Sequence, residues 1–157
     1  MIEDIVNKWL IDTKKDLFNN YIKLGLKASG DWGNSLESKS EVTSTTINAK
    51  ILANDYTEQL ENGRQPNKNQ SPEALKAWVG WAGSTFLDKW VKDKGINVNP
   101  YAVAWKIARE GWKVPNRYNK GGLVSDVITN DKIKELTSQL LLFKVDQIKS
   151  DVIKIVR

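Results

Sequence analysis

The sequence predicts an α+β fold in which several helices, including long N-terminal and C-terminal helices, pack on a small antiparallel β-sheet. Three observations lead to this prediction. Apolar residues recur at helical spacing near both ends of the chain, start signals precede two central helices, and a stretch rich in Ser, Thr, Val and Ile alternates as strands do. A length of 157 residues, 40% of them apolar, suits a single domain covering residues 1–157.

The first third of the chain contains a long helix and a hairpin. A helix is expected from Ile2 to about Lys27, and the turn-forming residues 29–34 should end it. Two antiparallel strands are expected within residues 36–53. A short helix then covers residues 56–62, and the positive φ that glycine tolerates should end it at Gly63. One face of the first helix carries its apolar residues: Ile2, Ile5, Val6, Trp9, Leu10, Leu17, Tyr21 and Leu24.

Two further helices open with a capping residue followed by proline. The first begins at Ser71-Pro72 and should run to Gly95, and the second begins at Asn99-Pro100 and should end at Gly111. Gly80 and Gly83 lie inside the first of these helices. Because glycine is unfavourable there by about 1 kcal/mol relative to alanine, a close helix or backbone approach is expected at both positions.

The last part of the chain begins with a basic loop over residues 113–122, which should be exposed and mobile. A short strand is expected at residues 123–128, and a final helix from Asp131 to about Val156. Five residues of that helix alternate at spacings of four and three, a narrow seam suited to packing within the chain or on a neighbouring molecule: Leu141, Val145, Ile148, Val152 and Ile155.

The composition argues against an enzyme. The chain has no cysteine and no histidine, which removes thiolate nucleophiles, the commonest general base and the commonest metal ligand. No cofactor or metal site is predicted. Glu58 and Glu61 are one helical turn apart, but such pairs are routine on solvated or interface faces, so a carboxylate-dependent hydrolase ranks low. No signal peptide and no membrane-spanning run is recognised, which favours production in the cytoplasm.

Charge and aromatic residues suggest contact surfaces. The net charge is +5, and a basic patch that faces phosphate or a partner is one interpretation of Lys106, Arg109, Lys113, Arg117 and Lys120, a solvated surface being the other. Of the seven tryptophans, Trp78, Trp90 and Trp105 occupy apolar stripes and should pack in the core. Three others lie at turns or off the stripes and are candidates for contacts between subunits: Trp32, Trp81 and Trp112.

The segment from Ala53 to Pro66 resembles a motif of tailed-bacteriophage tail-completion and head-tail connector proteins. In that family a strand leads into tyrosine, glutamate and glycine with proline close behind, and the matching residues are Tyr56, Glu61, Gly63 and Pro66. Residues 30–36, before the hairpin, and residues 104–111, a helix ending in glycine, agree with the family in order.

The resemblance implies a non-enzymatic virion protein of the phage neck, located at the head-tail junction or tail and assembled in the bacterial cytoplasm. It implies a homomeric ring of six or twelve copies, stacked with portal, neck and tail proteins around the DNA channel. The four matching residues would then be scaffold and interface positions, and an ion pair of Glu61 with Arg64 between subunits would fix ring register. A sequence-independent nucleic-acid-binding module is the alternative, motivated by the charge and the tryptophans.

Overall fold

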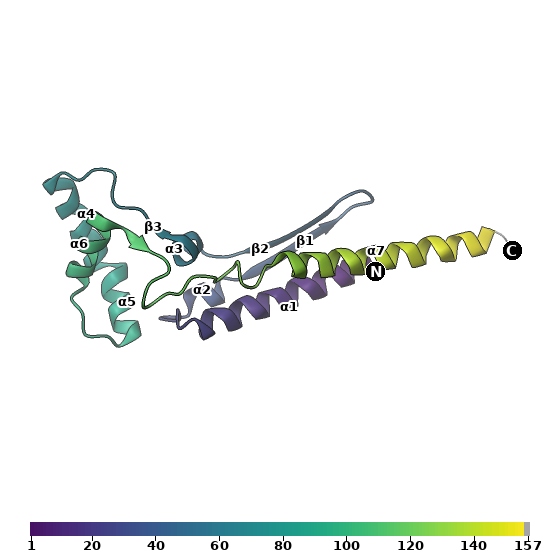
Figure 1. Ribbon diagram of the computed structural model, residues 1–157, viewed down its shortest axis with the longest axis horizontal. Coiled ribbons are helices and arrows are strands. Elements are labelled where there is room, and N and C mark those ends of the chain that lie inside the picture. Colours follow the sequence, from purple (N-terminus) through teal and green to yellow (C-terminus); the bar gives the residue numbers. More distant parts are fainter. Residues whose placement is uncertain (156–157) are drawn as a thin grey trace.

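The computed structural model describes residues 1–155 and confirms the α+β class. The molecule is elongated, with a helical lobe at one end and an arm of long elements at the other (Figure 1). The arm contains α1 (Ile2–Lys23), α2 (Asp31–Asn34), the strands β1 (Glu37–Val42) and β2 (Ile47–Leu52), and α7 (Asn130–Ile155). The lobe contains α4 (Pro72–Ser84), α5 (Phe86–Lys94) and α6 (Pro100–Glu110).

Two short stretches of the chain connect the arm to the lobe. The chain leaves the arm through α3 (Thr57–Asn62) and β3 (Gly63–Arg64), and it returns through β4 (Trp112–Lys113). Strands β3 and β4 pair antiparallel, with Gly63 opposite Lys113 and Arg64 opposite Trp112. This second two-stranded pairing was not predicted, because two-residue strands leave no alternation to recognise.

The predicted hairpin is confirmed. Strands β1 and β2 pair antiparallel from Glu37 opposite Leu52 to Val42 opposite Ile47. Thr43 closes the turn, donating its amide to the Thr46 carbonyl at 2.8 Å. Most hairpin side chains are exposed, and β1 contacts α1, where the Ser40 hydroxyl donates to the Asn7 side chain at 2.7 Å.

Most of the buried apolar side chains form two separate clusters. The lobe cluster comes from α4, α5 and α6: Leu75, Val79, Ala82, Leu87, Ala104, Ile107 and Ala108. The arm cluster lies where α1, α2, the hairpin and the turn after β4 meet: Leu17, Tyr21, Trp32, Leu36 and Leu123. Each cluster is small, so the long elements extend well beyond the core that holds them.

The start signals of α4 and α6 act as expected. The Ser71 hydroxyl accepts a hydrogen bond from the Ala74 amide at 3.3 Å, and the Asn99 side chain accepts one from the Tyr101 amide at 2.9 Å. Proline follows each cap at a position that needs no amide proton. These local signals fix where both helices begin.

The single helix expected from Ser71 to Gly95 is wrong, because the chain breaks at Thr85 (φ −107°, ψ −104°). The Ser84 and Thr85 hydroxyls donate to the Gly80 and Trp81 carbonyls, at 2.7 and 2.6 Å, and such bonds compete with a continuing helix. The close approach expected at Gly83 is confirmed, since a Cβ there would lie 2.5 Å from the Tyr101 ring. At Gly80 it is wrong, because nothing lies within 4 Å.

Three smaller predictions also need correction. Helix α1 ends at Lys23 rather than about Lys27, since Gly25 takes a positive φ of 67° and Leu26 donates back to Tyr21. The strand expected at residues 123–128 is a series of turns, in which the amides of Val127 and Ile128 donate to the Val124 carbonyl. The loop over residues 113–122 is only partly exposed, because Asn119 is buried and donates to the Leu60 carbonyl at 2.6 Å.

Candidate functional site

The corner formed by α3, β3 and β4 contains the residues that carry the family resemblance. Glu61 points from α3 to the turn after residue 122, where it accepts the amides of Val124 at 2.8 Å and Ser125 at 3.2 Å, and also the Ser125 hydroxyl. Burial by itself raises the pKa of Glu61, but these hydrogen bonds outweigh it and hold the pKa below its ordinary value of 4.5. Glu61 therefore serves an internal contact.

This contact gives a pH-dependent prediction. We expect Glu61→Gln to lower the free energy of unfolding by about 1–2 kcal/mol at neutral pH, because an amide offers one acceptor where the carboxylate has two. Since the folded-state pKa of Glu61 is lowered, its contribution is full above 4.5 and is lost as pH falls through the folded-state value. Denaturant unfolding at pH 7 and at about pH 3 measures the difference.

The matched control is Glu58→Gln, which makes the same change on an exposed side chain of the same helix. We expect it to alter stability by less than about 0.5 kcal/mol at either pH. A Glu61→Gln effect that persists undiminished at low pH would contradict the account.

Two glycines allow β3 and β4 to approach each other. Gly63 has a φ of 83°, and a Cβ there would lie 2.0 Å from the Trp112 carbonyl oxygen. Gly111 has a φ of 78°, and a Cβ there would lie 2.4 Å from the Arg64 carbonyl oxygen. The positive φ expected at Gly63 is confirmed, the helix ends at Gly111 as expected, and both positions exclude any side chain.

Arg64 is held within the chain, although it was predicted at a subunit interface. Its guanidinium lies 4.5 Å from the centre of the Trp78 ring and donates to the Asn67 side chain at 2.7 Å. Burial lowers the pKa of Arg64, and its buried Nη1 has no hydrogen-bond partner in residues 1–155. No ion pair joins Glu61 to Arg64 within the described chain, and Pro66 lies exposed on the following loop.

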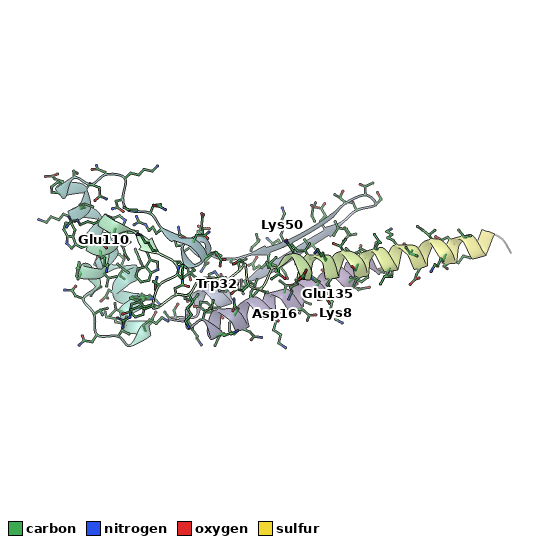
Figure 2. All side chains as sticks on the ribbon, viewed as in Figure 1. Lys8, Asp16, Trp32, Lys50, Glu110 and Glu135 are labelled. Atoms are coloured by element: carbon green, nitrogen blue, oxygen red, sulfur yellow. The ribbon has the colours of Figure 1, made fainter. Side chains whose placement is uncertain are left out.

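The prediction that Trp32 contacts another subunit is wrong. Its side chain is 1% exposed at the centre of the molecule, where α2 meets α1 (Figure 2). The indole donates to the Thr57 hydroxyl at 2.9 Å and packs on Tyr21 with ring centres 5.0 Å apart. A turn-forming sequence around Trp32 suggested exposure, but the short helix α2 directs the ring inward.

The other tryptophans divide differently from the prediction. Trp78 and Trp90 pack against the lobe cluster as expected, whereas Trp105 is 39% exposed, so its assignment to the core is wrong. Trp112 also packs against that cluster from β4. Trp81 is 58% exposed and remains an interface candidate, together with Tyr56, which is 41% exposed.

Sequence reasoning missed one exposed aromatic group. Trp81 lies 5.6 Å from Phe86 between ring centres, and both rings lie within 6.5 Å of Trp78. Phe86 is 46% exposed. The helix break at Thr85 brings these rings together. The continuous helix expected from the sequence did not predict that they meet.

All five cations of the predicted basic patch are exposed: Lys106, Arg109, Lys113, Arg117 and Lys120. None of them forms an ion pair in residues 1–155, and Arg117 lies over the Tyr118 ring at 4.7 Å. They come from α6, β4 and the loop after β4. Their charge is therefore available to an anionic neighbour.

The half of α7 beyond residue 140 projects past the N-terminus of α1, where Figure 1 shows no other element beside it. Two polar contacts join the first turn of α7 to α1: the Trp9 indole donates to the Lys132 carbonyl at 3.2 Å, and Lys132 pairs with Asp16. Its projecting half exposes large apolar side chains by 40–65%: Leu141, Leu142, Val145, Ile148 and Val152. The side chain of Ile155 lies outside the described residues.

Two shallow hollows lie on the arm. One is formed by α1 and α2 and lined by Ile11, Phe18, two lysines, Gly33 and Leu36. The other lies beside α3 and includes Asp55, Glu58 and Glu61. A raised carboxylate pKa in this hollow would favour a hydrolase, but the pKa of Glu61 is lowered. Among residues 1–155, no His, Cys, Asp or Glu group is arranged to hold a metal ion.

Comparisons with known proteins identify no relative: no family model, curated protein or solved structure matches the chain. Over the described residues, every helix is too short or too polar to cross a bilayer.

Proposed function

We propose that this chain is a structural subunit of the neck or head-to-tail connecting region of a tailed bacteriophage, where it forms part of a homomeric ring around the DNA channel. The observation that carries this proposal is the projecting half of α7, which exposes five large apolar side chains where no other element of the described chain lies beside it (Figure 1). A contiguous apolar face of this kind is typical of a surface that another protein covers.

The connector identity rests on the resemblance around residues 53–66. Of the matching residues, Glu61 and Gly63 hold the corner between arm and lobe together, while Tyr56 and Pro66 are exposed. This division suits a family motif that maintains a rigid subunit and presents part of its surface. Six or twelve copies, flanked by portal and tail proteins, are the assembly that this family implies.

The mechanism is geometric and needs no cofactor. A rigid subunit that makes the same contact with the next copy closes into a ring when the rotation between copies divides a full turn. Exposed Trp81 and Phe86 at the lobe are suited to such a contact, because aromatic residues are enriched in interface cores. The ring would act in the virion after assembly in the bacterial cytoplasm.

Sequence-independent nucleic-acid binding is the second candidate. The unpaired cations around α6 and β4 favour it, since a run of free lysines and arginines binds phosphate without reading bases. If all five contacted phosphates, the slope of log affinity against log salt would be about −4.5. In a connector ring the same cations would contact the packaged DNA or an acidic neighbour.

Electron microscopy of the purified chain tests the proposal. We expect closed rings of uniform size, formed without DNA. Isolated monomers that bind duplex DNA with the steep salt dependence described above would contradict the connector and favour the second candidate.

A further inference from the structure

We infer that the projecting half of α7 pairs in antiparallel orientation with the same helix of a second copy of this chain. The inference goes beyond the proposed function, because it names the contact, its register and its orientation. It rests on the exposed seam and on the charges beside the seam.

The seam has the geometry of a short coiled coil. Leu141, Val145, Ile148 and Val152 follow one another at spacings of four, three and four, so they fall on one narrow face. Their exposed fractions are 65, 40, 61 and 53%, which leaves the face open over two heptads. A second copy of this chain presents the same seam, which matches this one in length and in apolar character.

The flanking charges select one register. If Val145 packs against Ile148 of the partner subunit, Leu141 packs against Val152 of the partner subunit, and four apolar layers form about a two-fold axis. In this arrangement Lys144 faces Asp151 of the partner subunit, and the same pair repeats across the axis. Every layer is apolar and both flanking pairs are attractive.

Other arrangements place like charges together. Parallel pairing brings Lys144 against the partner's Lys149, twice over. Sliding the antiparallel pair by one heptad in one direction sets Lys149 against the partner's Lys149 and Asp151 against the partner's Asp151. Sliding it in the other direction sets Lys144 against the partner's Lys144 and brings Ser138 into the seam. Like charges at these positions oppose pairing, so charge complementarity favours a single arrangement.

A two-fold contact of this kind adds to a ring without replacing its closing contact. Ring closure needs a head-to-tail contact, whereas antiparallel α7 pairs would join copies in twos. Six pairs would give a twelve-copy assembly made of two rings.

Charge exchange tests the orientation. We expect Lys144→Asp and Asp151→Lys each to raise the dissociation constant of the α7 contact about tenfold, since each turns two attractive pairs into repulsive ones. The double exchange should restore the wild-type value. Sedimentation velocity over a range of concentrations measures this, with Ser150→Asp and Asp146→Lys as controls that change charge on the outer face of the helix.

Cysteine cross-linking tests the register independently, because the chain has no native cysteine. A mixture of Leu141→Cys and Val152→Cys proteins should form the mixed disulfide, whereas Leu141→Cys alone should not cross-link. In the inferred register the two copies of position 141 are about 16 Å apart along the axis, too far for a disulfide.

Three results would overturn the inference: tighter association of Lys144→Asp, self-cross-linking of Leu141→Cys, or a chain that stays monomeric at every concentration. A twelve-copy assembly of two rings that does not separate into single rings in Lys144→Asp would also overturn it, while leaving the proposed function standing. Pairs that respond to the charge exchanges without any ring would support the inference and contradict the proposed function.

Discussion

Replacing Gly63 with alanine should lower the free energy of unfolding by about 3 kcal/mol or more. The new methyl group would lie 2.0 Å from the Trp112 carbonyl oxygen, and the residue holds a φ of 83° that alanine rarely adopts. The opposing atom belongs to the backbone, so it cannot move aside as a flexible side chain would. Thermal or denaturant unfolding of the Gly63→Ala protein measures the loss.

Substitutions at two other glycines separate the two causes of this loss, the steric clash and the backbone strain. Gly25 has a φ of 67° with nothing within 4 Å, so Gly25→Ala should cost only the backbone strain, about 1 kcal/mol. Gly80 lies inside α4 without a neighbour, so Gly80→Ala should stabilise the protein by about 0.5–1 kcal/mol. If Gly63→Ala were as mild as Gly25→Ala, the close pairing of β3 with β4 would be wrong.

Replacing Trp32 with alanine should lower the free energy of unfolding by about 3–5 kcal/mol. The ring is 1% exposed, packs on Tyr21, and its indole hydrogen bond to Thr57 joins α2 to α3. Its removal would leave a cavity in the arm cluster, and the Thr57 hydroxyl would keep only its bond to the Asn54 carbonyl. Trp32→Phe should recover part of this loss by refilling the space without the hydrogen bond.

Trp81→Ala is the matched control, because the same truncation is made at a side chain that is 58% exposed. We expect it to change the stability of the monomer by about 1 kcal/mol or less while weakening association if the Trp81 surface joins subunits. Equal losses of stability for the two variants would contradict the placement of Trp32 in the core.

The elements that could be predicted from the sequence carry local signals. The caps at Ser71 and Asn99 and the periodic stripe of α1 act within one or two helical turns, so they work without knowledge of the rest of the chain. The break at Thr85 depends on the Ser84 and Thr85 hydroxyl groups, which donate hydrogen bonds to carbonyls of the preceding turn. The missing strand at residues 123–128 depends on long-range contacts, because Glu61 captures the amides that a strand would have used.

The candidate surfaces were predictable to the extent that they follow periodicity. The seam of α7 is visible in the spacing of Leu141 to Val152, and its exposure agrees with a contact beyond the chain. Trp32 shows the opposite case. Its sequence neighbourhood indicates a turn, but whether a ring at a turn points inward depends on a neighbour such as Tyr21, which no local pattern reveals.

The molecular mass of the wild-type protein in solution, measured over a range of concentrations with and without duplex DNA at low and moderate salt, tests the central claim most directly. An assembly subunit should populate one discrete species of many copies, independent of DNA. A chain that remains monomeric at every concentration, and binds DNA with an affinity that falls steeply as salt rises, would contradict the claim.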